Sequence, residues 1–478
     1  MRTRSMRSPR TDRRLFPSGW SAVGCCVLAA LLFAAPALPA QDEDFDLDDL
    51  FEEEFGDEGG ESASSSAELP SSLTNVQGFL EFEPRIYFRD RGEDRNGEQT
   101  ILRGEIELEF RLASEWTAFA RPRFLVDLTD GDYERFEPFE GYVTWDRESW
   151  DLRFGQFVEN WGIVDTYNPI DVVNRRDFGS DLLDAERLGE LGVRVRRNFE
   201  GGDVIGEPTL SAYWLPVWRA TEFASDDQRF AFGNEMVPFD EDRGFEPSGA
   251  ERSFVALRFQ HTLNSGPANA DVQFLLSRGP ERTPQLFQPD AGTLAPAYFG
   301  AFAAGFGFRA VPNADVAGAW LSEFTLKAEV VYKNPYDFSD SPIEAPEEFV
   351  ATVVGFDRIY PGVFGTQDQL TWTMEYARED GASDPSAQLR PFLNDGIVRV
   401  LWEANDFART SVEVRGFYDF ENDEVVVEGI YERQLRGWHE DLKLSVQAQY
   451  FDPPETGESL FDFFPNNSSL SVALRWDF

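Results

Sequence analysis

The stretch LSVALRWDF, residues 470–478, decides the fold class of this chain. Apolar residues stand at every second position from Leu470 to Phe478, and small or charged residues stand between them. A period of two indicates a strand with one apolar and one polar face. Such a strand leaves a reactive edge in an open sheet, whereas a closed barrel pairs both of its edges. The stretch therefore predicts either the closing strand of a barrel or an amphipathic strand of a water-soluble β protein.

The same alternation recurs from residue 76 onward. Leu102, Ile106 and Leu108, for example, alternate with charged residues such as Arg103 and Glu107. Breaks separate these segments, whose length is close to the roughly 9–11 residues with which a strand crosses an outer membrane. We predict eighteen strands, or sixteen if one weak hairpin is lost. The predicted strands are 76–89, 99–113, 116–128, 136–146, 150–158, 188–198, 208–217, 251–263, 270–279, 301–311, 319–333, 347–357, 367–379, 395–404, 408–419, 423–433, 440–451 and 469–478.

The breaks alternate in length, as they do in bacterial barrels with short periplasmic turns and long outer loops. Residues 114–115 form a short break and residues 218–250 a long one. Aromatic residues near the strand ends predict two interfacial belts. The tryptophans follow the same division, with Trp116 and Trp145 beside short breaks, Trp476 beside the C-terminus, and Trp161, Trp214 and Trp218 beside long breaks. We predict an all-β fold: a transmembrane antiparallel β-barrel of the bacterial outer membrane, with both termini in the periplasm.

The chain divides into three predicted regions. Residues 1–40 combine a basic start, an uncharged apolar run and small residues near Ala40, which is typical of a secretory signal peptide. Residues 41–75 are an acidic flexible segment, and residues 76–478 are the barrel. Both cysteines lie in the leader, and His261 and His439 stand far from any Ser/Asp pattern. The sequence thus predicts no catalytic residue, metal site or cofactor, and we expect that the protein is not an enzyme.

The formal net charge of the chain is −44. An acidic surface repels nucleic acid and favours cations or basic partners, so no nucleic-acid partner is expected. Twelve acidic and no basic residues fall within 42–61, where Leu47, Leu50, Phe51 and Phe55 follow helical spacing. This segment is either a disordered tail or a docking peptide for a periplasmic protein.

Charged residues of both signs fall on the polar faces of the predicted strands, and Lys327 and Glu329 are one such set. Opposite charges on neighbouring strands can pair along the wall, and eighteen strands leave room for an aqueous channel. The residues predicted to line the lumen are Arg103, Glu105, Glu107, Arg121, Arg123, Arg194 and Arg196.

The long break that begins at residue 159 is the candidate constriction. It is rich in polar and aromatic residues and poor in the Ser and Gly of a flexible loop. It either packs inside the barrel as a polar constriction or packs on neighbouring loops outside it. The candidate residues are Trp161, Asp165, Asn168, Asp171, Asn174, Arg175 and Arg176.

Three short motifs mark this region: RFGQ at 153–156, WG at 161–162 and NPIDV at 168–172. Together they resemble the W-G…N-P-x-D-V signature of a poorly characterised family of proteobacterial outer-membrane barrels with a domain of unknown function, distantly similar to porins and the alginate-export barrel. The resemblance implies fold and location more than substrate. Trp476 and Phe478 also resemble the C-terminal insertion signal of outer-membrane barrels, which implies outer-membrane lipid, lipopolysaccharide and the barrel-assembly machinery as partners.

We therefore expect a porin-like outer-membrane channel for passive or substrate-selective passage of small hydrophilic solutes. The excess of carboxylates predicts a preference for cations. The alternative is an outer-membrane component of an envelope export or transport assembly, which docks a periplasmic partner through the acidic N-terminal segment.

Overall fold

The computed structural model describes residues 72–88, 97–129, 134–179, 185–202, 206–224, 229, 231–232, 238–265, 268–290, 292–381, 392–452, 464 and 467–478. All of them belong to the compact unit Glu68–Phe478. The predicted signal peptide and the acidic segment as far as residue 71 lie outside the described residues. The first strand begins at Leu73, three residues before the predicted start of the barrel.

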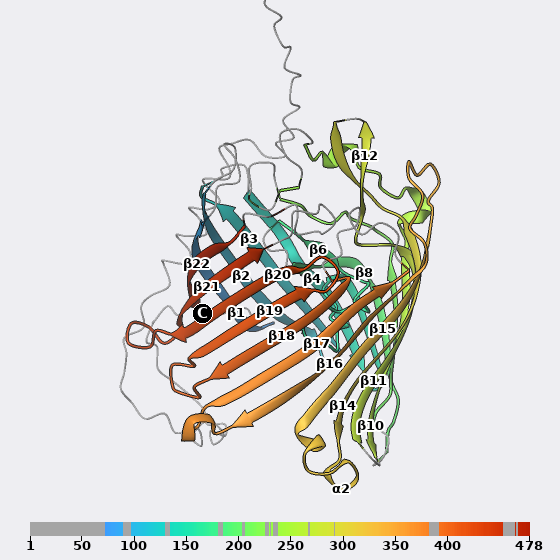
Figure 1. Cartoon of the computed structure of the whole chain (residues 1–478). Helices are drawn as coiled ribbons and strands as arrows, with labels where there is room; N and C mark the ends of the chain where they lie inside the picture. The colour runs from blue at the N-terminus through green and yellow to red at the C-terminus, as the bar shows by residue number, and fades with distance from the viewer. Residues whose placement is uncertain are drawn as a thin grey trace, which may run out of the picture. The chain divides into compact units, whose positions relative to one another are not determined.

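Eighteen strands of the described chain form one closed antiparallel sheet (Figure 1). Each strand pairs with the strands before and after it, which is the predicted fold. The barrel strands are β1 (Leu73–Tyr87), β2 (Glu98–Ala113), β3 (Trp116–Asp127), β4 (Glu134–Arg147), β5 (Trp150–Phe157), β8 (Glu190–Asn198), β9 (Thr209–Leu215), β10 (Phe254–Ser265), β11 (Ala268–Pro280), β14 (Gly300–Pro312), β15 (Phe324–Tyr336), β16 (Phe349–Pro361), β17 (Gln369–Asp380), β18 (Asn394–Glu403), β19 (Ser411–Asp419), β20 (Glu424–Gln434), β21 (Leu442–Asp452) and β22 (Ser469–Asp477).

The last strand closes the ring by pairing with the first. Phe82 lies opposite Leu474 in this antiparallel pairing. The pairing reaches the final residue, because the Phe478 N–H donates to the Gly78 carbonyl at 2.9 Å and the Gly78 N–H donates to the Phe478 carbonyl at 2.8 Å. The role of residues 470–478 as the closing strand is thus confirmed, whereas that of Phe478 and Trp476 as an insertion signal stays a prediction.

The two faces of the wall are the reverse of those in a water-soluble β protein. On β1 the side chains of Phe82 and Ile86 are 44% and 48% exposed, whereas Glu83 and Arg85 are buried on the inner face. The same division recurs around the ring, for example at Phe274, which is 50% exposed on β11. An exposed apolar band around a charged interior requires lipid outside and water inside. The closed ring leaves no unpaired edge in that lipid, so the chain is an outer-membrane β-barrel.

The two ends of the barrel differ in the length of their connections. We call one end the turn end and the other the loop end. The turn end carries the connections 114–115, 148–149, 199–208, 266–267, 313–323, 362–368, 404–410 and 435–441. The loop end carries 88–97, 128–133, 158–189, 216–253, 281–299, 337–348, 381–393, 420–423 and 453–468. The predicted alternation is therefore present, and the assignment of the turn end to the periplasm stays a prediction.

Shorter elements lie within these connections. The β12–β13 hairpin stands at the loop end and α2 at the turn end (Figure 1). No helix in the described residues is long and apolar enough to cross a membrane. The short elements are β6 (Arg175–Asp177), β7 (Glu186–Leu188), β12 (Gln285–Asp290), β13 (Thr293–Ala297), α2 (Ala314–Ala317) and the 3-10 turns η2 (Glu241–Arg243), η3 (Gly249–Arg252), η4 (Leu321–Glu323) and η5 (Val363–Gly365).

Two tryptophans do not lie in the predicted outer aromatic belt. Trp214 is 52% exposed and fits it, but Trp161 and Trp218 are only 1% and 3% exposed. The ring of Trp161 packs against Tyr213 at 5.0 Å, and that of Trp218 packs against Tyr298 at 4.6 Å. The prediction was wrong for these two residues because their connections fold back into the barrel and bury them.

Apolar residues replace charged ones on parts of the inner wall toward the loop end. Connections from the loop end pack against them and form two buried clusters. One joins Val353, Ile397, Phe417 and Phe451 of the wall to Phe178, Phe223, Phe232 and Phe392 of the connections. The other joins Ala256, Leu275, Ala303, Val331 and Ala351 of the wall to Trp161, Ile170, Val172 and Val173.

Candidate functional site

The described part of the connection between β5 and β8, residues 158–179 and 185–189, lies inside the barrel, and we call it the inner segment. The Trp161 carbonyl accepts a hydrogen bond at 2.7 Å from Gln273 Nε2 on β11. The Ile163 N–H donates at 2.5 Å to Glu329 on β15. These wall residues are buried on the inner face of the barrel. Of the two sequence-based alternatives, the structure therefore supports packing within the lumen.

Apolar packing holds the first half of the inner segment to the wall. Trp161 and Ile170 are each 1% exposed and contact the cluster that contains the small wall residues Ala303 and Ala351. Small side chains at these positions leave space for the large ones of the segment. Burial of each large side chain contributes about 1.5–3 kcal/mol. The inner segment is thus attached as a packed element of the fold.

A single carboxylate, that of Glu329, binds several backbone N–H groups in the first half of the inner segment. Glu329 accepts hydrogen bonds from the N–H groups of Ile163 at 2.5 Å, Val164 at 3.2 Å and Ile170 at 3.5 Å. The Asn168 amide, with its nitrogen placed toward the acceptors, donates to Glu329 Oε1 at 3.2 Å. Glu329 is 1% exposed, so these hydrogen bonds join the segment to a buried carboxylate of the wall.

The contacts of the Trp-Gly and Asn-Pro residues account for the spacing between these two pairs. A Cβ atom at Gly162 would lie 1.8 Å from the side-chain amide of Asn168, so glycine is needed for the segment to fold back on itself. Trp161 supplies the packing that fastens the segment before this bend. Asn168 then returns to the carboxylate that also binds Ile163 and Val164. The Trp-Gly and Asn-Pro pairs therefore belong to one docking device.

The tip of the segment is fastened by charge. Lys327 on β15 is buried, forms an ion pair with Asp165 of the segment and contacts Asp357 Oδ1 at 2.7 Å. Glu375 on β17 accepts from the N–H of Asp165 at 2.8 Å and of Thr166 at 3.1 Å. Asp165 is thus held at both its side chain and its backbone.

The second half of the segment contains the β6–β7 hairpin, whose strands pair at Arg175 and Leu188. The Asp171 carboxylate accepts from Arg176 Nη2 at 3.0 Å, from Asn174 Nδ2 at 3.2 Å, and from Arg187 Nε. Its side chain has no exposed surface. Asp171 therefore joins the two strands of the hairpin to the turn before them.

Arg175 and Asp177 fix the hairpin to its surroundings. Arg175 forms an ion pair with Glu222 of another connection, and Asp177 pairs with Arg135 of β4 at 2.5 Å. Burial raises the pKa of the Asp177 carboxyl, although the guanidinium of Arg135 acts in the opposite direction. Both are buried structural residues.

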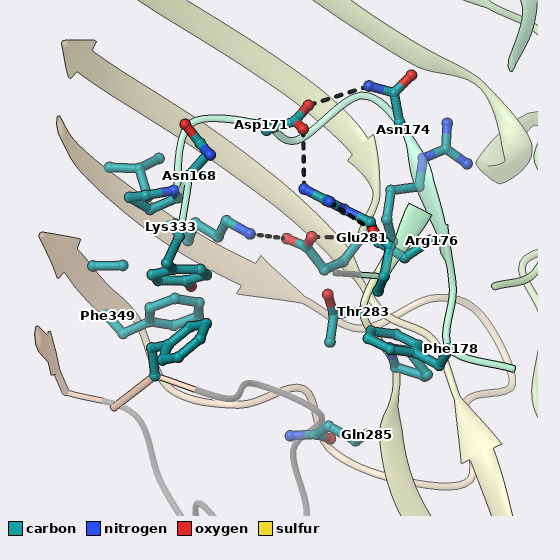
Figure 2. A pocket seen from close by; sticks show the side chains of 18 of the residues that line it. Asn168, Asp171, Asn174, Arg176, Phe178, Glu281, Thr283, Gln285, Lys333 and Phe349 are labelled. Atoms are coloured by element: carbon teal, nitrogen blue, oxygen red, sulfur yellow. Dashed lines mark hydrogen bonds and ion pairs between the residues drawn. The ribbon is translucent and has the colours of Figure 1, made fainter. Parts of the chain in front are cut away.

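Two cavities border the inner segment. The vestibule, of about 1120 Å³, lies on the turn-end side and is lined by Arg309, Lys443 and Arg475 among others. The loop-end cavity, of about 120 Å³, is lined by Lys333 and Phe349 among others (Figure 2). Four described residues line both, and we call them the eyelet: Thr166, Asn168, Arg176 and Ala185.

The predicted constriction residues divide into two groups. Asp165, Asn168 and Arg176 line the vestibule, and Asn168, Asp171, Asn174 and Arg176 line the loop-end cavity. Trp161 and Arg175 line neither cavity and act in packing and ion pairing. The structure thus brings five of the seven candidates to a cavity surface within the described chain.

The predicted lumen residues all lie on the inner face. Arg103, Glu105, Arg121 and Arg123 line the vestibule. The other three are held in ion pairs: Glu107 with Arg121 at 3.3 Å, Arg194 with Asp151 at 2.7 Å and Glu159 at 2.6 Å, and Arg196 with Asp151 at 3.4 Å.

The charge of the vestibule differs from that of the whole chain. Among the described residues that line it, nine are basic and six are acidic. The net charge of −44 therefore does not describe the surface that a solute would meet. The basic residues are Arg85, Arg103, Arg121, Arg123, Arg176, Arg187, Arg309, Lys443 and Arg475, and the acidic ones are Glu81, Glu83, Glu105, Asp165, Glu186 and Glu432.

Sequence reasoning missed the wall residues that hold the inner segment. Alternation placed Lys327 and Glu329 on the inner face, but nothing local to them identified the segment as their partner. Glu375 and the pair formed by Lys333 and Glu281 were not singled out. The described residues contain no group of three or more His, Cys, Asp or Glu side chains arranged to hold a metal ion.

Comparison with known proteins places the chain beside solved porin structures. It matches no protein-family profile and no curated protein. It is similar to a BenF-like porin from Pseudomonas fluorescens, at 9% identity over 85% of this chain and 98% of that one, with a TM-score of 0.48. It is also similar to Pseudomonas aeruginosa OccK2 (OpdF) in complex with glucuronate, at 9% identity over 84% of this chain and 97% of that one, with a TM-score of 0.48. A third similar structure is Acinetobacter baumannii OccAB3, at 9% identity over 85% of this chain and 99% of that one, with a TM-score of 0.46. The resemblance to the W-G…N-P-x-D-V family stays a prediction.

Proposed function

We propose that the protein is a porin-like diffusion channel for small hydrophilic solutes, with the inner segment as its constriction. One observation carries the proposal: the closed barrel holds a segment that is fixed to β11, β15 and β17 and borders two cavities that meet at the eyelet. An eighteen-stranded barrel is wide enough for an aqueous channel when nothing fills it. Its selectivity then depends on the residues that narrow it.

The eyelet residues suit a hydrated solute. Thr166, Asn168 and Arg176 present a hydroxyl, an amide and a guanidinium, which can replace the hydrogen bonds a solute gives up with water. The carboxylates and the lysine that anchor the segment oppose its displacement. A rigid polar eyelet selects solutes by size and by hydrogen-bonding pattern.

Conductance in planar bilayers tests this function. The purified protein is expected to give discrete conductance steps, and a variant that lacks residues 41–71 is expected to give steps of the same size. If neither the full protein nor the deletion variant gives conductance steps, and the deletion abolishes binding to a periplasmic protein, the export-assembly alternative is favoured. Absence of steps from a correctly folded barrel would contradict the channel.

Ion selectivity is expected to follow the vestibule. The excess of basic side chains there supports a preference for anions, in contrast to the cation preference predicted from net charge. In a KCl gradient, the reversal potential is expected to have the sign that a chloride-selective channel produces. Arg309 has no ion-pair partner among the described residues, so Arg309→Glu should lower the chloride-to-potassium permeability ratio by about twofold or more.

The control for this measurement is Arg252→Glu, which makes the same charge change at a residue that lines neither cavity. Its permeability ratio should equal that of the unmodified protein. A potassium preference in the unmodified protein would show that the charge of the whole chain outweighs that of the vestibule.

A further inference from the structure

We propose that the loop-end cavity is a binding subsite for a small uncharged, hydroxylated solute of the size of a triol. The inference rests on the proposed channel function and names the class of solute that pauses in the channel. The cavity shares Thr166, Asn168, Arg176 and Ala185 with the vestibule. A solute bound there would therefore lie directly before the eyelet.

The volume of the cavity sets the size of the solute. The cavity measures about 120 Å³. A protein cavity of roughly 150 Å³ holds one benzene molecule, which has six heavy atoms. The loop-end cavity thus has room for a molecule of about the same number of heavy atoms, such as glycerol.

The charged groups around the cavity are already paired, which argues for an uncharged solute. Each cation that lines it lies in an ion pair, and Asp171 also pairs with Arg187, so a bound ion would have to compete with existing pairs and lose its hydration. Among the described residues these pairs are Arg176 with Asp171 at 3.0 Å, Lys333 with Glu281 at 2.8 Å, and Arg282 with Glu190 at 3.4 Å.

Neutral hydrogen-bonding groups remain available in the same cavity. The Thr283 hydroxyl and the Gln285 amide have no hydrogen-bond partner among the described residues, and both line the cavity. Figure 2 shows Thr283 between the rings of Phe178 and Phe349, with Gln285 to one side of them. A hydroxyl and an amide can each both donate and accept, as the hydroxyl groups of a polyol also do.

The remaining wall of the cavity is aromatic. Phe178, Phe349 and Phe392 line it, and the ring of Tyr167 lies 5.4 Å from that of Phe392. The faces of aromatic rings carry partial negative charge, so they attract C–H groups next to hydroxyls and repel carboxylates. A purely apolar solute would fit the rings but would leave Thr283 and Gln285 unpaired. The combination favours a polyol over an anion or a hydrocarbon.

Uptake into liposomes tests the subsite. Glycerol is supplied outside vesicles that contain the full-length protein, and osmotic swelling reports its rate of uptake. Saturation with concentration is expected. Thr283→Val keeps the side-chain volume and removes one hydrogen bond, so the half-saturating concentration should rise about twofold to tenfold. Gln285→Met should act in the same direction.

Two controls separate the subsite from the channel. Thr352→Val makes the same change on the outer face of β16 and should leave uptake unchanged. Lactate matches glycerol in size but is charged, and it should not compete with glycerol uptake. Glycerol uptake that stays linear while conductance steps persist, or lactate that competes with glycerol uptake, would overturn the subsite and leave the channel. Absence of conductance steps would contradict the channel and the subsite together.

Discussion

Replacing Glu329 with alanine is expected to increase the single-channel conductance by about twofold or more and to make it fluctuate, because a released segment no longer holds the bore narrow. Glu329 accepts from the N–H groups of Ile163, Val164 and Ile170, and from the Asn168 amide. Each buried donor left without an acceptor costs about 1–3 kcal/mol, so the docked segment loses several kcal/mol in total. The strand ladder of β15 does not depend on this side chain.

Two further variants make this result specific. Glu413→Ala removes a carboxylate from the inner face of β19, where its partners are Arg399 and Arg415 and not the inner segment. Its conductance should stay close to that of the unmodified protein. Glu329→Gln keeps an acceptor oxygen, so its conductance should lie between that of Glu329→Ala and that of the unmodified protein. An unchanged conductance in a folded Glu329→Ala barrel would show that the segment does not limit the flow of ions.

Replacing Trp161 with alanine is expected to expose the inner segment to trypsin. Trp161 is 1% exposed, packs on Tyr213 and lies 5.5 Å from the guanidinium of Arg258. Loss of such a buried side chain costs about 3–5 kcal/mol. The loss weakens mainly the docking of the segment, because the rest of the barrel keeps its strand pairing. Cleavage after Arg176 or Arg187 is the measurable sign.

The matched control is Trp438→Ala, at a tryptophan that is 83% exposed on a turn between β20 and β21. Its cleavage pattern should equal that of the unmodified protein. If trypsin leaves the segment intact in Trp161→Ala while the heat stability of the whole barrel falls, then Trp161 supports the wall and not the segment.

The strand order could be predicted because its signal is local. Alternation within one stretch, as in residues 470–478, places each side chain on a face without knowledge of any partner. The same signal placed Arg103, Glu105, Lys327 and Glu329 on the inner face.

The docking of the inner segment could not be predicted because its signal is spread over the chain. Trp161 bonds through its carbonyl to Gln273, and its packing cluster contains Ala303 and Ala351. Alanine on a strand carries little information until the tryptophan opposite it is known. For the same reason Trp161 and Trp218 were expected at the lipid interface, although they are buried inside.

The sign of the net charge that lines the vestibule also could not be predicted from the sequence. Net charge adds the carboxylates of every surface together, including residues 42–61, which lie outside the described residues. The vestibule is lined instead by a subset in which basic residues outnumber acidic ones in the described chain. Only the arrangement of the strands selects that subset.

The anchors of the inner segment impose an order on folding. The segment leaves the wall after β5, yet its hydrogen-bond partners lie 112 to 210 residues later, on β11, β15 and β17. Contacts at such separations form slowly, since long loops must close first. The segment can therefore be fully anchored only after β11, β15 and β17 have all joined the sheet. A barrel that lacks any of these three strands would leave part of the segment without its partners on the wall.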